Sequence, residues 1–187
     1  MQIGLDFGAA PALMVPAPVL RLSEPQQIFA LARALADVAR GLHPLSKFKP
    51  QDLMLILAAA ARTAAPSFGS TLADGAALDE LNRRIVKSLA RKDRKPFEDV
   101  TAAYAAAPPI DFGAWVVDNR LAAARAAAIV TGDLGASVEV LRQEDPALLY
   151  LEGEDLVLSG EPIADLLRYW CSDAALELRR RLAAPRA

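Results

Sequence analysis

Histidine and cysteine, the side chains on which zinc sites and cysteine nucleophiles depend, are scarce in this chain, which has one of each, His43 and Cys171, among its 187 residues. A zinc site takes about three protein ligands drawn from His, Cys and acidic residues, and a cysteine nucleophile needs a histidine within hydrogen-bond reach. We expect His43 to be structural or solvated at a helix end. We expect Cys171 to be a small packing residue buried beside Trp170. No Gly-x-Ser-x-Gly pattern exposes a serine, so this inventory predicts neither catalysis nor a cofactor.

A run of cations between residues 83 and 95 is the other feature that could do chemistry. A basic stripe of this kind can bind an anion or a nucleic acid, and its candidate residues are Arg83, Arg84, Lys87 and Arg91. Acidic residues at 79, 80, 93 and 98 lie next to the stripe and dilute its field. We therefore favour a solvated helix face and keep nucleic-acid or anion binding as an alternative function.

The composition is that of an ordinary globular protein, with 53% hydrophobic and 24% charged residues. Lys and Arg number 21 against 23 Asp and Glu, and the net charge of -2 gives no general attraction to nucleic acid or anionic membranes. The longest apolar block, residues 53–61, is too short to span a bilayer, and a single cysteine fits a reducing compartment. We expect a soluble cytoplasmic protein with no membrane association.

A stretch over residues 111–141 organises the rest of the chain, and it is predicted to form one long apolar helix, a break at Thr131-Gly132-Asp133 and a second short helix. Asp111 is the expected N-cap of the long helix, and Asp133 starts the second one. Because both faces of the long helix are apolar, it is predicted to be a central core helix. One face carries Phe112, Trp115, Val116, Asn119, Ala122, Ala123, Ala126, Ile129 and Val130, and the opposite side carries Val117, Leu121 and Ala128.

Prolines, glycines and caps divide the remaining chain into further helices. We expect them near residues 25–42, 51–65, 74–92, 96–108, 134–142, 160–170 and 172–182. Residues 12–22 are interrupted by prolines and predict one bent edge strand or a small hairpin. Residues 148–158 fit either a hairpin around Gly153 or a short helix and loop.

The predicted fold is mainly α, a single compact helical domain of about seven to eight helices around the central apolar helix, with a small N-terminal β element. Its expected limits are residues 12–182, preceded by an irregular lead-in over residues 1–11 and followed by a frayed tail over residues 183–187.

Residues 31–38, LARALADV, resemble the zinc-binding helix of zincin-type metallopeptidases of the CAAX-prenyl-protease class, which reads much like LAHELAHV. The apolar frame matches, whereas the chemical positions differ. Arg33 stands at the first histidine, Ala34 at the general base, and Asp37 at the second histidine.

The central helix resembles the second half of that peptidase site. Arg120 stands at the glutamate that completes the zinc, and Ala124 stands at the acid that follows, while Ala123 and Arg125 are kept. The segments GDLGASVEVL and DLLRYWCSDAALELRRRL resemble the C-terminal domain of certain tetratricopeptide-repeat proteins of delta-proteobacteria, which look like degenerate relatives of the same peptidases. The resemblance covers about residues 12–182 and implies a bacterial protein.

The resemblance implies a retained fold whose zinc chemistry is lost, because no ligand remains to hold a metal and no base remains to activate water. It implies a non-catalytic protein-binding or scaffolding domain with a protein partner, alone, as an oligomer or in a larger assembly. An enzyme of unrecognised chemistry is the opposing alternative. We hypothesise that Arg33, Asp37 and Arg120 now form a charge cluster. The alternative is that these side chains point to solvent on unrelated faces.

Overall fold

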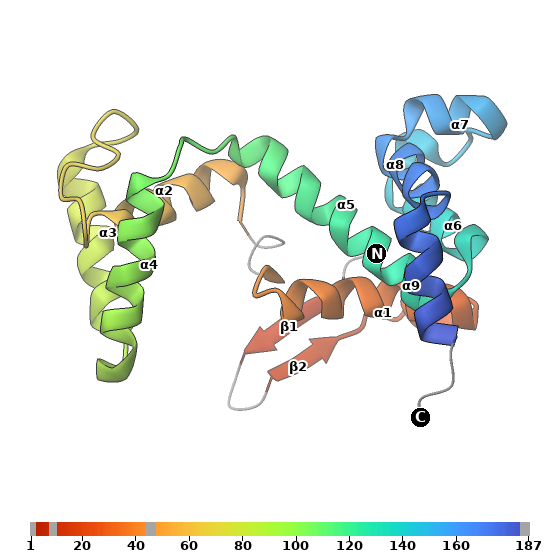
Figure 1. Cartoon of the computed structure of the whole chain (residues 1–187), viewed down its shortest axis with the longest axis horizontal. Helices are drawn as coiled ribbons and strands as arrows, with labels where there is room; N and C mark the ends of the chain where they lie inside the picture. The colour runs from red at the N-terminus through yellow and green to blue at the C-terminus, as the bar shows by residue number, and fades with distance from the viewer. Residues whose placement is uncertain (1–2, 8–10, 44–47, 184–187) are drawn as a thin grey trace. The chain divides into compact units, whose positions relative to one another are not determined.

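The computed structural model describes residues 3–7, 11–43 and 48–183, and in these residues helices dominate (Figure 1). The predicted mainly α class is confirmed. The α-helices of this part of the chain are α1 (Glu24–Ala39), α2 (Pro50–Ala61), α3 (Gly75–Ser88), α4 (Arg94–Ala106), α5 (Phe112–Thr131), α6 (Leu134–Glu144), α7 (Gly153–Ser159), α8 (Glu161–Trp170) and α9 (Asp173–Ala183). Short 3-10 turns are η1 (Val19–Arg21), η3 (Arg91–Asp93) and η4 (Pro146–Leu148).

The β element is an antiparallel hairpin of β1 (Gly4–Phe7) and β2 (Pro11–Met14). The prediction of an irregular lead-in over residues 1–11 was therefore wrong for Gly4–Phe7. The strand expected within residues 12–22 stops at Met14 and gives way to η1, because Pro16 and Pro18 lack the amide donors that a longer ladder needs.

The predicted caps of the two central helices are present. The Asp111 carboxylate accepts the backbone amide of Ala114 at 3.0 Å, and the Asp133 carboxylate accepts that of Ala136 at 2.9 Å. Each cap satisfies one of the backbone donors left free at a helix start. These short polar residues therefore set where α5 and α6 begin.

The segment over residues 148–158 takes the helical alternative. It runs from the end of η4 into α7, where Gly153 begins the helix with a positive φ of 53°. Acidic residues occupy the first turn of α7, where they complement the helix dipole. In the predicted tail over residues 183–187, Ala183 still belongs to α9, and residues 184–187 lie outside the described residues.

The described residues divide into two compact units with a boundary inside α5, between Val116 and Val117. Unit 1 comprises residues 1–43 and 117–187, and unit 2 comprises residues 44–116. We expected one core around the central helix, whereas each unit has a hydrophobic cluster of its own.

Unit 1 is built around α6, which contacts both α1 and α8, and its core contains fully buried Phe29, Ile163 and Leu166. From α5 the same cluster receives only alanines, at positions 124, 127 and 128. The prediction that α5 is a core helix enclosed on both faces was partly wrong, since Val130 is 62% exposed and Ala126 is exposed. A helix that is apolar on every side gives no sequence signal for which side packs.

Unit 2 packs α2 against α3 and α4. Ala58 and Ala59 of α2 and Leu78 of α3 are buried at its centre. Asn82 of α3 donates from its side-chain amide to the Ala59 carbonyl and to the Thr63 hydroxyl, both at 2.8 Å. This polar link joins α3 to the end of α2 across an interface of small side chains.

Candidate functional site: the charged side chains of the first helix

The five positions singled out by the peptidase resemblance all lie in unit 1. Arg33, Ala34 and Asp37 lie on α1, and Arg120 and Ala124 lie on α5. Arg33 and Asp37 are four residues apart and therefore face the same side of the helix. Ala124 is only 3% exposed and belongs to the hydrophobic cluster, whereas Arg120 is exposed.

Arg33 connects α1 to α6. Its guanidinium forms an ion pair with Glu144, and the two side chains are 22% and 25% exposed. The same guanidinium lies 5.6 Å from the centre of the Phe29 ring, within the range of a cation–π contact. Arg33 is therefore held by contacts inside unit 1, and its partner is not the one that we predicted.

Asp37 is half-buried, and burial raises the pKa of its carboxyl above the ordinary value of 3.8. The positive charges of Arg33, Arg40 and Arg120, and then His43, act against this rise. Arg120 therefore lies within electrostatic reach of Asp37, as the hypothesised cluster requires. Among the described residues, however, no ion pair joins Asp37 to Arg33 or Arg120, so these charges interact through space without direct pairing.

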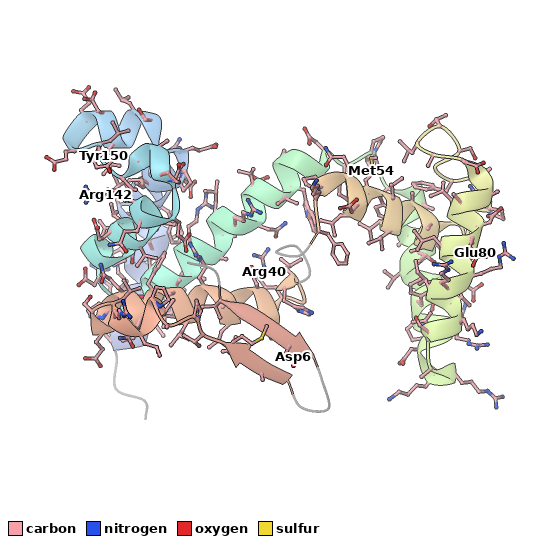
Figure 2. All side chains as sticks on the ribbon, turned by 180° about the vertical axis from the view of Figure 1, so that it is seen from behind. Asp6, Arg40, Met54, Glu80, Arg142 and Tyr150 are labelled. Atoms are coloured by element: carbon pink, nitrogen blue, oxygen red, sulfur yellow. The ribbon has the colours of Figure 1, made fainter. Side chains whose placement is uncertain are left out.

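Sequence reasoning missed Arg40, Asn119 and Glu144. Arg40, labelled in Figure 2, extends from α1 and donates to the Asn119 side-chain oxygen of α5 at 2.6 Å. Asn119 is only 7% exposed, and an amide on an otherwise apolar helix face was a usable signal for such a bond. Glu144 gave no such signal, because 111 positions separate it from Arg33.

The residues present do not fit the zinc that the resemblance implies. Guanidinium groups offer no lone pair to a metal, and alanine offers no donor atom. Of the five positions, only Asp37 has a ligand atom. The described part of the chain contains no group of three or more His, Cys, Asp and Glu side chains placed to hold a metal ion.

Arg125, one of the two residues kept in the resemblance, connects α5 to α8. Its Nε donates to Asp165 Oδ2 at 2.8 Å, and its Nη2 donates to Oδ1, so the pair is bidentate. Asp165 is 9% exposed, and its hydrogen bonds with Arg125 raise the pKa of the arginine above the ordinary value. The guanidinium also lies 5.5 Å from the Tyr169 ring centre. Beside this pair runs a shallow groove lined by Ala122, Arg125, Ala126, Ile129, Tyr169 and Leu178.

The structure places the single histidine, His43, and the single cysteine, Cys171, in different degrees of burial. His43 is half-buried near the end of α1 and contributes to the electrostatic environment of Asp37. Cys171 is exposed, so the expectation of a buried packing residue was wrong. It follows the last residue of α8, where the chain turns toward α9 and leaves the helix–helix interface.

The predicted anion-binding face is partly neutralised by its own unit. Arg83 and Arg84 both pair with Glu80, each at 3.1 Å. Asp79 forms an ion pair with Arg62, in which Arg62 Nε lies 2.7 Å from Asp79 Oδ1. Lys87 and Arg91, the other two residues of the predicted face, take part in none of the ion pairs of the described residues.

The uncompensated cations gather where α3 passes through η3 into α4. Lys95 there pairs with Asp99 at 2.9 Å. The others form no ion pair within residues 48–183, and we call them the basic corner: Lys87, Arg91, Lys92 and Arg94. All four are exposed. The positive patch is therefore displaced from the middle of α3 toward the α3–α4 connection.

No protein-family model matches the chain, and no curated protein or solved structure is significantly similar to it. The peptidase resemblance therefore stays a prediction that rests on the quoted residues. In the ranges that the structure describes, each helix is either too short or too polar to cross a membrane.

Replacing Asp37 by Asn tests the electrostatic cost of this carboxylate. A carboxyl whose pKa is higher in the folded state favours the fold when protonated, and this advantage disappears as the pH rises from 3.8 through the folded pKa. We expect Asp37→Asn to raise the melting temperature at pH 7 by a few degrees at most, since 1 kcal/mol corresponds to about 2–4 °C in a chain of this size. The difference should disappear near pH 3. Circular dichroism melts measure it.

The exposed Asp6 provides the control, because Asp6→Asn should leave the melting temperature unchanged across the same pH range. A lower melting temperature for Asp37→Asn at pH 7 would show that the surrounding arginines outweigh burial.

Replacing Arg125 by Ala tests the link between α5 and α8. The change leaves Asp165 buried without its cation, and we expect a loss of about 2 kcal/mol in the free energy of unfolding, measured with urea. The expected loss lies below that of a fully buried pair because the Arg125 side chain is 39% exposed. Arg120→Ala, on the same helix but exposed, should change stability by less than about 0.5 kcal/mol. Equal losses for both would contradict the assigned pairing.

Proposed function

We propose that the chain is a non-catalytic protein-binding module that keeps a peptidase-like helical frame without its zinc chemistry. The observation that carries the proposal is the placement of Arg33. At the position of the first zinc ligand, this side chain forms an ion pair with Glu144 and lies over Phe29. The helix that would present catalytic groups to a substrate instead holds unit 1 together.

The neighbouring positions support the loss of catalysis. Peptide hydrolysis by a zinc enzyme needs a metal to polarise the carbonyl and a base to activate water. Ala34 and Ala124 have no group for either task, and Ala124 is packed in the core. Asp37 alone has an oxygen ligand, and burial disfavours its charged form, which is the form that binds metal.

Exposed apolar side chains near α7 support protein binding. Tyr150 is 92% exposed, Leu158 is 75% exposed, and Leu149 beside Tyr150 is 37% exposed. Single exposed apolar residues are normal, but an aromatic and two leucines on one short segment resemble the composition of interface cores. Figure 2 labels Tyr150, which lies next to α7.

Nucleic-acid binding through α3 has less support. Two of the four predicted cations, Arg83 and Arg84, are paired with Glu80. A bound phosphate backbone would have to compete with those ion pairs. The remaining cations, Lys87 and Arg91, lie in the basic corner together with Lys92 and Arg94.

Metal analysis and a cleavage assay on the purified chain test the loss of catalysis. We expect no stoichiometric zinc after dialysis and no cleavage of casein or unfolded peptides. A variant with Arg33→His, Ala34→Glu, Asp37→His and Arg120→Glu rebuilds the ligands and base of the resembled peptidases. If the residue assignment is correct, this variant should bind one zinc ion. Stoichiometric zinc and cleavage in the native chain, both abolished by Asp37→Ala, would overturn the proposal.

A further inference from the structure

The small total charge of the chain conceals an unequal distribution between the two units. Unit 1 contains 11 Lys and Arg against 15 Asp and Glu, whereas unit 2 contains 10 against 8. The net charges are therefore -4 and +2, which add to the total of -2. Local fields of opposite sign are therefore present on one chain, although its total charge is nearly balanced.

The negative charge of unit 1 is concentrated between residues 142 and 168, where seven acidic residues occur without a cation. Three of them have tasks inside the unit: Glu144 pairs with Arg33, Asp165 pairs with Arg125, and Asp145 caps η4. The other four are exposed and form no ion pair in the described residues. We call them the acidic segment: Glu152, Glu154, Asp155 and Glu161.

Exposed apolar side chains lie next to the acidic segment in the sequence. Tyr150 precedes it, and Leu158 lies on α7 between its members. A central aromatic and aliphatic patch with a charged rim is the usual anatomy of a protein interface. The first turn of α7 explains why two acids are favoured there, but the helix dipole does not compensate four exposed negative charges.

The basic corner of unit 2 carries the opposite charge in the same number. Its cations span the end of α3, η3 and the start of α4, with Asp93 as the one acid among them. Arg94 is the first residue of α4, where a positive charge is opposed by the helix dipole. The stability of α4 therefore does not explain why a cation stands at position 94, whereas binding to an external anionic partner would explain it.

We infer that this chain associates with a second copy of itself, the basic corner of one copy binding the acidic segment of the other. The inference rests on the proposed protein-binding function and names the partner. The two surfaces differ, so the contact is heterologous: every copy has one free surface of each kind, and copies add in a ring or a row. Exposed charges are screened by salt, so association weakens as ionic strength rises.

A nucleic acid is the competing partner for the basic corner. It would use the four cations but would leave the acidic segment and Tyr150 without a function, and the negative charge of unit 1 would repel it. A second copy uses both charged surfaces and covers the exposed Tyr150 and Leu158 as well. The observations therefore favour self-association.

Sedimentation velocity with neutralised variants tests the inference. The native chain should associate at about 50 mM salt, and the association should weaken at least about tenfold near 500 mM. The corner variant, Lys92→Gln with Arg94→Gln, and the segment variant, Glu154→Gln with Asp155→Asn, should each be monomeric. Mixed in equal amounts, the two variants should form a 1:1 dimer that grows no further, because one intact surface of each kind remains.

Arg83→Gln with Arg84→Gln is the matched control, since these two arginines already pair with Glu80 and should leave association unchanged. A native chain that stays monomeric at low salt would overturn the inference, and so would variants that associate as tightly as the native chain. Salt-sensitive binding of duplex DNA by a monomeric native chain, lost in the corner variant, would assign the corner to nucleic acid instead. None of these results depends on zinc or cleavage, so the inference can fail while the proposed function stands.

Discussion

The carboxylate of Asp165 lies almost fully buried on α8, and a charged group in that position is stable only with a cation bonded to it. Arg125 of α5 supplies that cation through two parallel hydrogen bonds, and its guanidinium also lies over Tyr169. The bidentate geometry constrains both the distance and the rotation of α5 relative to α8 within unit 1. Apolar packing alone would leave this distance and this rotation less restricted, because α5 contributes only alanines to the hydrophobic cluster of unit 1.

Arginines perform this task repeatedly in unit 1. Arg33 connects α1 to α6, Arg40 connects α1 to α5, and Arg125 connects α5 to α8. Alanine surfaces are smooth and allow neighbouring helices several registers at similar energy. We interpret the three arginine contacts as the interactions that select one register, which apolar residues of equal volume would not do. Arg120, which is exposed, has no such contact in the described residues.

Local signals in the sequence were enough to predict most helices. Asp111 and Asp133 marked helix starts, and prolines ended the strand and opened several helices. The buried side of α5 could not be predicted, because a buried side is recognised by apolar residues on one face and polar residues on the other, and α5 is apolar on all sides. The division into two units was missed for a related reason: one of its two boundaries falls inside this uninterrupted helix.

The candidate site was predicted less completely than the fold, because its contacts join residues far apart in the chain. The peptidase resemblance placed Arg33, Asp37 and Arg120 in one cluster, and the positive charges of both arginines do act to lower the pKa of Asp37. It gave no means of finding Glu144 or Asp165, which lie 111 and 40 positions from their arginine partners. A sequence pattern identifies which charges share a helix face, but the choice of partner is made by tertiary packing.

Unit 1 contains four more acids than cations and unit 2 contains two more cations than acids, so the charges that internal pairing leaves exposed are of opposite sign in the two units. In unit 1, Arg33 and Arg125 form ion pairs between helices, and the acids of the acidic segment remain without an ion-pair partner in the described residues. In unit 2, Asp79 pairs with Arg62, and Glu80 pairs with Arg83 and Arg84. The cations of the basic corner remain without an ion-pair partner in the described residues. The charge available for binding is thus what internal pairing leaves over, and it differs in sign between two parts of a nearly neutral chain. A count of charges over the whole sequence averages this difference away.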